Sequence, residues 1–325
     1  MRAAQVTRLD GPDAVEINNI EEPTGDGVIV EVHAAGAAFP DALLTRGRYQ
    51  YRPKLPFVPG AEIAGIVRSA PANSHVDPGD RVVGLTMLTG GMAEVAVLSP
   101  KRVFKLPDNV TFEEGAGLLF NDLTVCFALR VRGRLQQGET VLVHGAAGGI
   151  GTSTLRLAPV LGASRTIAVV STEAKGQTAT AAGATDVVLA EGFKDTVKEL
   201  TGERGIDVLV DPVGGDRMAD SLRSLAPGGR LLVIGFTGGE IPTVKVNRLL
   251  LNNIDIVGVG WGAWTLTHPE ALAEQWAQLE LLLTAGQLPL PEPMIYPLDE
   301  AASAIACLEN RTAKGKIVLR VRDNV

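Results

Sequence analysis

The sequence predicts an α/β protein with a β-rich part and a doubly wound domain built on a six-stranded parallel sheet. Three observations predict this. The length of 325 residues corresponds to about two domains. Short apolar runs broken by Gly, Pro, Asp and Asn fill the first 110 or so residues. From about 121 to 262, continuous apolar runs alternate with helical segments, which is typical of parallel strands buried on both faces.

The N-terminal part contains five short apolar runs that predict strands: Val28–Val32, Ile63–Val67, Arg81–Leu85, Met92–Leu98 and Val103–Leu106. One helix is expected near Asp41–Arg46. A second helix is expected to start at Thr111, because Thr111 and Glu114 have the spacing of a capping box. This part therefore reads as mainly β.

The middle part contains six apolar runs of strand length, separated by helix-forming segments such as Ala174–Ala182. The six runs are Thr140–His144, Thr166–Val170, Asp186–Val188, Ile206–Val210, Arg230–Ile234 and Ile254–Val259. Strands that alternate with helices in this way form a doubly wound parallel sheet.

The tail, from about residue 263, predicts two helices and a strand. Thr267 and Glu270 have capping-box spacing, and the apolar face that follows ends at Gly286. That face consists of Leu272, Trp276, Leu279 and Leu283. Asp299 is expected to cap the second helix. Lys316–Val321 reads as a strand that rejoins the N-terminal part.

Composition excludes several classes of protein. Thirty basic and 37 acidic residues give a net charge of −7, and only 14 residues are aromatic (8 Phe, 3 Trp, 3 Tyr). Nucleic acid is therefore not an expected partner. No run of 18 apolar residues and no signal-type N-terminus is found, so neither a membrane partner nor secretion is expected. Cys126 and Cys307 form no CxxC, so we expect reduced thiols in a cytoplasmic protein.

A glycine-rich turn follows the first strand of the middle part. It runs from His144 to Gly151 and fits GxGxxG as Ala146-x-Gly148-x-x-Gly151. Gly148 would let the backbone approach a pyrophosphate, and Gly151 would let the helix sit close to the strand. The helix N-terminus would then bind the phosphates through its N–H groups and its dipole. The strand–turn–helix context predicts a dinucleotide site.

The end of the second strand of this part favours NADPH over NADH. NAD-specific sites carry Asp or Glu there, whereas this chain has Ser171 and Thr172. Two hydroxyls accommodate a 2′-phosphate, and Lys175 supplies positive charge. Glu173 is the one residue that opposes this interpretation.

Several motifs together resemble the zinc-free quinone oxidoreductase (zeta-crystallin-like) branch of the medium-chain dehydrogenase/reductase superfamily. The resemblance covers nearly the whole chain. It rests on Gly36–Asp41 running to Gly47-Arg48-Tyr49, on Leu55–Gly65, Val143–Gly151, Asp211–Gly215 and Gly315–Leu319. It implies a discontinuous GroES-like catalytic domain (1–120 and 263–325) and a Rossmann NADPH-binding domain (121–262), with cofactor and substrate held between them.

The resemblance also bears on zinc. Zinc-dependent relatives place Cys and His where this chain has Ala38 and Ala61, and alanine cannot ligate a metal. Without a Lewis acid, alcohol oxidation is disfavoured. The expected reaction is hydride transfer from NADPH to quinones or α,β-unsaturated carbonyls. A retained zinc alcohol dehydrogenase is the least favoured alternative.

The resemblance further implies a set of cofactor contacts. The pyrophosphate, the adenosine phosphate, the carboxamide and the nicotinamide ring each receive their own residues. Gly148, Gly149 and Ile150 would contact the pyrophosphate, and Ser171, Thr172 and Lys175 the adenosine phosphate. Thr124 would contact the carboxamide. The nicotinamide ring would be flanked by Phe236, Thr237, Val259, Gly260 and Trp261. Lys316 would close the site from the tail, and Phe39, Pro40 and Asp41 would lie beneath the reacting ring.

Tyr49 is the candidate catalytic residue, since its phenol could orient a carbonyl or donate a proton. Many members carry Asn at Ala38 and Tyr at Leu43, and both are missing here. This departure motivates the alternative of an NADPH-binding protein with little activity, used for sequestration or partner contact.

The apolar run Ile254–Val259 could pair edge to edge with its copy in a second subunit. We therefore expect a homodimer, and the resemblance implies the same, because relatives form homodimers through this edge.

Overall fold

The computed structural model describes residues 1–322. The chain divides into two compact units, Met1–Leu123 with His268–Val325, and Thr124–Thr267. Among the described residues, no helix combines the length and apolarity needed to cross a bilayer.

The first unit is built on a mainly antiparallel seven-stranded sheet and a two-stranded sheet. The larger sheet has the order β14-β15-β3-β4-β5-β7, and β6 pairs with β3 off this path. Its strands are β3 (Val28–Ala37), β4 (Glu62–Ser69), β5 (Arg81–Leu85), β6 (Val95–Leu98), β7 (Val103–Lys105), β14 (Met294–Pro297) and β15 (Ile317–Arg320). The small sheet pairs β1 (Arg2–Val6) with β2 (Val15–Asn19), two strands that the apolar pattern does not reveal.

The tail strand does rejoin the N-terminal part. β15 pairs antiparallel with β3, with Leu319 opposite Ala35. On its other side β15 pairs in parallel with β14. The residues of β15 that face the core, Ile317 and Leu319, are fully buried in the same cluster as Val30 and Val32.

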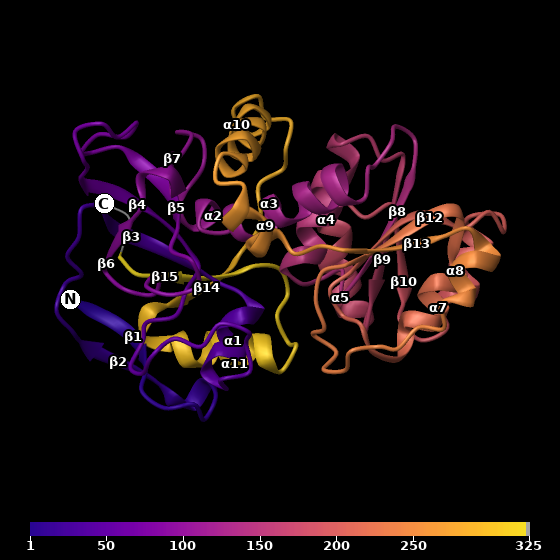
Figure 1. The fold of residues 1–325 in the computed structure, drawn as a ribbon, viewed down its shortest axis with the longest axis horizontal. Helices are drawn as coiled ribbons and strands as arrows, with labels where there is room; N and C mark the ends of the chain where they lie inside the picture. The colour runs from indigo at the N-terminus through magenta and orange to yellow at the C-terminus, as the bar shows by residue number, and fades with distance from the viewer. Residues whose placement is uncertain (323–325) are drawn as a thin grey trace. The chain divides into compact units, whose positions relative to one another are not determined.

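Helices of the first unit are α1 (Phe39–Thr45), α2 (Phe112–Gly115), the first part of α3 (Leu119–Cys126), α10 (Ala271–Thr284) and α11 (Ala301–Glu309), with short turns at Pro12–Ala14, Pro100–Arg102 and Leu298–Glu300. α1 and α11 pack side by side (Figure 1). The capping box at α2 is confirmed: the Thr111 side chain accepts the Glu114 N–H, and the Glu114 carboxylate accepts the Thr111 N–H.

Two predicted caps in the tail are wrong. Thr267 ends α9 (Trp261–Thr267) instead of starting the next helix, and α10 begins only at Ala271 without a side-chain cap. Asp299 lies in a short 3₁₀ turn before α11 and forms an ion pair with Arg2. The predicted apolar face of α10 is confirmed, because Leu272, Trp276, Leu279 and Leu283 are all buried. Gly286 follows its end with φ +64°, which suits glycine.

The second unit has the predicted six-stranded sheet, with every pair parallel and the order β10-β9-β8-β11-β12-β13. The first strand in sequence, β8, lies in the middle and the order reverses between β8 and β11, as in a Rossmann domain. The strands are β8 (Thr140–His144), β9 (Arg165–Val170), β10 (Asp186–Leu189), β11 (Ile206–Asp211), β12 (Leu225–Val233) and β13 (Asp255–Gly258).

Helices cover both faces of this sheet, with α4 and α5 on one side and α7 and α8 on the other (Figure 1). Their bounds are α4 (Gly149–Val160), α5 (Glu173–Ala181), α6 (Phe193–Leu200), α7 (Met218–Arg223) and α8 (Asn247–Asn252), with a π-helical turn at Phe127–Arg132 and a 3₁₀ turn at Gly215–Arg217. Leu142, Ile167, Leu209 and Leu231 from four strands are fully buried in the core of this unit.

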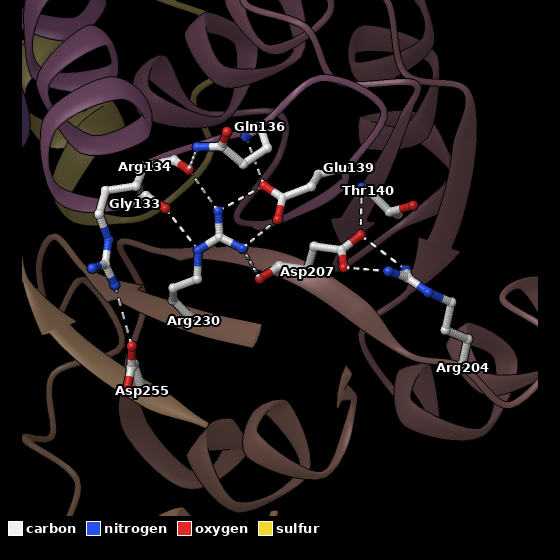
Figure 2. A network of polar contacts seen from close by, with 9 residues as sticks. All are labelled: Gly133, Arg134, Gln136, Glu139, Thr140, Arg204, Asp207, Arg230 and Asp255. Atoms are coloured by element: carbon white, nitrogen blue, oxygen red, sulfur yellow. Dashed lines mark hydrogen bonds and ion pairs between the residues drawn. The ribbon is translucent and has the colours of Figure 1, made fainter. Parts of the chain in front are cut away.

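A partly buried polar network connects the amino ends of the central strands (Figure 2). The Arg230 guanidinium donates to both carboxylate oxygens of Glu139, at 2.7 and 2.6 Å, and to the Gly133 carbonyl. Asp207 accepts the Thr140 N–H and pairs with Arg204. The glycine-rich turn follows the carboxyl end of β8. Because the strands are parallel, the network and the turn lie at opposite ends of the strands.

Candidate functional site

The glycine-rich turn links β8 to α4 and leaves the start of α4 uncapped. Gly148 is the N-cap residue, in extended conformation, and has no side chain to cap the helix. Its own N–H donates to the Gly145 carbonyl at 2.9 Å, which closes the turn. Because the first N–H groups of a helix lack intrahelical acceptors, those of Gly149 and Ile150 suit an anion. These residues therefore fit a pyrophosphate.

Only glycine fits at position 151. A Cβ built there would lie 2.4 Å from the Gly145 carbonyl oxygen and 2.5 Å from the backbone of Ala146. Such contacts are impossible without moving the backbone of the turn. The close approach of α4 to the end of β8 thus depends on Gly151, as the sequence pattern indicated.

The end of β9 places two hydroxyls at the start of α5. Thr172 is the N-cap of α5, and its Oγ1 accepts the Lys175 N–H at 3.3 Å. Ser171 and Thr172 are exposed and Lys175 is half-buried. Since a hydroxyl both accepts and donates, Thr172 can cap the helix and still donate its O–H to a phosphate.

The ends of β11, β12 and β13 complete this edge of the sheet. Asp211, which ends β11, accepts the N–H groups of Val213 and Gly214 at 2.8 and 2.9 Å. The Thr237 N–H donates to the Pro212 carbonyl and holds the segment after β12 against this turn. Val259 follows β13 and donates its N–H to the Val233 carbonyl. Phe236 and Thr237 are half-buried, whereas Val259 and Trp261 are buried.

The sheet therefore brings together four chain segments that carry predicted cofactor residues. They follow the carboxyl ends of β8, β9, β12 and β13, which lie at one edge because all six strands are parallel. Ligands of doubly wound domains bind at this edge, next to the point where the strand order reverses. Thr124, the remaining predicted residue of this unit, is 7% exposed on α3.

In the first unit, Asp41 is a buried structural acceptor. One carboxylate oxygen accepts the Ala38 N–H at 2.8 Å, and the other accepts the Gly60 N–H at 2.9 Å. Burial raises the pKa of Asp41 to about 6, against the opposing effect of these two N–H groups. Phe39 and Pro40 form the first turn of α1 beside it.

Tyr49 packs, half-buried, against the core of the first unit. Burial raises the pKa of its phenol, and the negative charge of Asp41 raises it further. The phenol is therefore protonated at neutral pH.

Lys316 lies directly before β15, buried against Glu62. Its ammonium lies 2.5 Å from the Glu62 carboxylate, and the two side chains are 3% and 1% exposed. The second oxygen of Glu62 accepts the Phe120 N–H at 2.8 Å. Burial raises the pKa of Glu62, and the Lys316 charge and the Phe120 N–H oppose that rise. The sequence placed Lys316 near the cofactor but did not reveal this partner.

The contact between His144 and Ser221 was also not predicted from the sequence. His144, at the end of β8, is fully buried, and its Nε2 lies 2.8 Å from Ser221 Oγ in α7. Its ring packs edge-on against Phe193 in α6, with centroids 4.9 Å apart. Burial lowers its pKa to about 4, so the imidazole is neutral and braces the strand that leads into the glycine-rich turn.

The positions at which the resemblance expects zinc ligands carry methyl groups. Ala38 and Ala61 are 7% and 3% exposed, and neither side chain has a donor atom. Within residues 1–322, no three His, Cys, Asp or Glu side chains are grouped as metal ligands would be. The residues present at these two positions do not fit a zinc ion.

Comparisons with known proteins agree with this architecture. Residues 24–108 match the alcohol dehydrogenase GroES-like domain, and residues 149–278 match the zinc-binding dehydrogenase family. Quinone oxidoreductase-like protein 2 of Rattus norvegicus is 36% identical over 99% of this chain and 92% of its own length.

Solved structures are similar over the whole chain. A probable oxidoreductase from Mycobacterium abscessus has 41% identity and a TM-score of 0.90, with 99% of each chain covered. The quinone oxidoreductase of Escherichia coli, solved in complex with NADPH, has 28% identity and a TM-score of 0.89, with 99% of this chain and 100% of that chain covered.

A GroES-like domain joined to a Rossmann-type parallel sheet defines a medium-chain dehydrogenase/reductase. Within that superfamily, the chain belongs to the quinone oxidoreductase family.

Proposed function

We propose that the chain is an NADPH-dependent oxidoreductase that transfers hydride to quinones or α,β-unsaturated carbonyls without zinc. The observation that carries the proposal is the edge where the uncapped start of α4 and the hydroxyls after β9 come together. The quinone oxidoreductase of Escherichia coli that binds NADPH shares this fold at a TM-score of 0.89.

The glycine-rich turn would hold the pyrophosphate. The N–H groups of Gly149 and Ile150 would donate to its oxygens, and the dipole of the 12-residue α4 would favour its negative charge. A Cβ at Gly148 would lie 3.3 Å from the Gly145 carbonyl oxygen, which is tighter than an ordinary contact, so glycine suits this closed turn.

The end of β9 would select the 2′-phosphate. Ser171 and Thr172 would donate O–H groups, and the Lys175 ammonium would balance the charge. The strand itself ends without a carboxylate, and Glu173, the first residue of α5, is the one acidic side chain next to these groups. These features favour NADPH over NADH.

NADPH, when bound, would supply the hydride. Thr124 would hold the carboxamide, while Phe236, Thr237, Val259, Gly260 and Trp261 would flank the nicotinamide ring. Phe39 and Pro40 would lie beneath the reacting ring, and Asp41, whose carboxylate accepts two backbone N–H groups, would hold their turn in place. The reduced substrate also needs a proton, and Tyr49 is the candidate donor, because a phenol carries its proton at neutral pH.

The zinc-free part of the proposal rests on Ala38 and Ala61, which carry no ligand atoms. Quinones and activated alkenes accept hydride without a metal to polarise them, whereas alcohol oxidation requires stabilisation of an alkoxide.

Anaerobic oxidation of NADPH with a panel of quinones and enals tests the substrate class. We expect turnover with at least one member, and a lower kcat in Tyr49→Phe with little change in KM. Tight NADPH binding without any turnover would instead support the alternative, a binding protein of low activity. Zinc bound stoichiometrically to the purified protein would refute the metal-free mechanism.

We also propose a homodimer through β13. This strand lies at the edge of the six-stranded sheet and pairs only with β12 within the described chain. Leu250 and Leu251 in the preceding helix α8 are 77% and 73% exposed. Antiparallel pairing of β13 with its copy would satisfy both open edges at once.

A further inference from the structure

The buried pair of Lys316 and Glu62 connects three segments that are distant in sequence. Glu62 is the first residue of β4, Lys316 lies immediately before β15, and Phe120 lies in the first turn of α3. Glu62 accepts from Lys316 through one oxygen and from the Phe120 N–H through the other. The carboxylate thus caps a helix while it pairs with a lysine 254 residues away.

Two glycines, Gly36 and Gly117, leave the space that the Glu62 and Lys316 side chains occupy. A Cβ at Gly36 would lie 2.6 Å from Glu62 Cγ and 2.2 Å from the Ala116 carbonyl oxygen. At Gly117 a Cβ would lie 3.2 Å from Lys316 Cγ. Any larger residue at position 36 would therefore displace the Glu62 side chain.

Glu62 serves α3 in two ways. A helix leaves the N–H groups of its first turn without partners, and a carboxylate there also interacts favourably with the helix dipole. Without Lys316, burial would favour the protonated form of Glu62. A neutral carboxyl group is a weaker hydrogen-bond acceptor than a carboxylate and does not interact with the helix dipole through a negative charge. The lysine charge is what makes this cap effective.

The helix that Glu62 caps also carries a predicted cofactor residue. Thr124 lies four residues after Phe120, one turn along the same side of α3. The chain passes from the first unit to the second within this helix, between Leu123 and Thr124. A shift at the start of α3 would be transmitted to Thr124 because the helix is short and continuous.

We propose that Lys316 is a positioning residue, which acts through Glu62 to fix α3 and Thr124 instead of donating to the dinucleotide itself. This inference rests on the proposed function, because it assigns Thr124 to the nicotinamide carboxamide. It reassigns Lys316 from the cofactor contacts that the resemblance implies.

Three variants of the full chain test the proposal: Glu62→Gln, Lys316→Met and the double variant. Arg230→Met is the matched control, because it breaks another largely buried ion pair, with Glu139, at the amino ends of the Rossmann strands (Figure 2). Affinities are measured for NADPH and for 2′,5′-ADP, a fragment that lacks the nicotinamide.

We expect Glu62→Gln and Lys316→Met each to weaken NADPH binding by about tenfold, and the double variant to lose no more than either single variant, because the two residues act as one unit. Binding of 2′,5′-ADP should stay within about twofold in all variants, and Arg230→Met should bind both ligands like the wild type.

Loss of NADPH affinity in Lys316→Met with unchanged affinity in Glu62→Gln would overturn the proposal, because Lys316 would then contact the cofactor directly. Wild-type affinity in all three variants would also overturn it.

Failure of the proposed function has a separate signature, since wild-type protein would then not bind NADPH. Hydrogen exchange of the Phe120 amide still decides the structural part in that case. Faster exchange in Glu62→Gln and Lys316→Met but not in Arg230→Met supports the positioning role, whereas unchanged exchange contradicts it.

Discussion

In the proposed site, single residues at the end of β9 would decide which dinucleotide the chain prefers. Ser171, Thr172 and Lys175 gather within one turn of the start of α5, and Thr172 already accepts the Lys175 N–H. In the proposed site the two hydroxyls would donate hydrogen bonds to a 2′-phosphate, and the lysine would supply the positive charge that this group requires.

Replacing Lys175 with alanine should weaken NADPH binding and leave NADH binding unchanged. A hydrogen bond to a charged group contributes about 1.5 kcal/mol or more, so the dissociation constant for NADPH should rise roughly tenfold. Calorimetric titration with both dinucleotides measures this. Lys198→Ala in α6 is the control, and an equal loss for NADH and NADPH would contradict a role at the 2′-phosphate.

His144 should make the stability of the protein depend on pH. Its pKa is about 4 in the folded chain and about 6.5 when unfolded, so the unfolded chain binds the proton more tightly. The resulting stabilisation is fully present above about pH 6.5 and is lost as the pH falls toward 4, by up to roughly 3 kcal/mol. Urea unfolding between pH 4 and 7.5 should give a flatter profile for His144→Gln. An unchanged slope would show that His144 is not the responsible group.

At the scale of elements, the glycine-rich turn and α4 form the centre of the candidate site. The turn depends on close approach between backbone atoms, which Gly151 permits and a side chain would prevent. The other elements of the site are placed by the parallel sheet, which aligns the ends of its strands.

Gly151→Ala should disrupt the turn, because its Cβ would overlap the backbone at Gly145 and Ala146. Overpacking of this kind costs about 1–3 kcal/mol in stability, and NADPH affinity should fall with it. Gly262→Ala in α9 is a suitable control, since a Cβ there meets no atom within 4 Å. Thermal unfolding and NADPH titration of both variants measure the difference. Equal behaviour of the two variants would contradict the account of the turn.

Elements with a strong local pattern could be predicted from the sequence, and those decided by distant contacts could not. The six strands of the Rossmann sheet were all predicted from apolar runs, and five of them agree with prediction to within two residues at each end. β12 begins at Leu225, five residues before the predicted start, because its first part contains Pro227, Gly228 and Gly229. α9 escaped prediction because its sequence, WGAWTLT, mixes glycine, aromatic and β-branched residues. The cap assigned to Thr267 was wrong for the same reason, since this residue belongs to the end of α9.

The candidate site divides in a similar manner. Gly148, Gly151 and Thr172 could be recognised from local spacing, because turns and caps are local structures. The partner of Lys316 could not be recognised, since Glu62 is 254 residues away. A glutamate within an apolar run gives no indication in the sequence of which basic residue pairs with it. His144 was likewise identified only as a residue beside the turn, without Ser221.

At the scale of the whole molecule, β13 is one of the two edge strands of the six-stranded sheet, with β10 at the other edge. Edge strands tend to pair with other chains unless they are covered or charged. Ile256 and Val257 occupy the middle of this strand, and both are half-buried.

Ile256→Asp should convert the proposed dimer into a monomer, because like charges would face each other across the two-fold axis. Sedimentation should show a species of about twice 34.1 kDa for the wild type and one of 34.1 kDa for the variant. Leu281→Asp on α10, an exposed position outside this edge, should remain dimeric. A monomeric wild type at micromolar concentration would rule out the dimer.

Calorimetric titration of the full chain with NADPH and with NADH tests the central claim most directly, because the proposed reaction, selectivity and positioning role all require a dinucleotide at the carboxyl edge of the six-stranded sheet. We predict one NADPH per chain, bound at least about tenfold more tightly than NADH. Absence of NADPH binding, or tighter binding of NADH, would contradict the account.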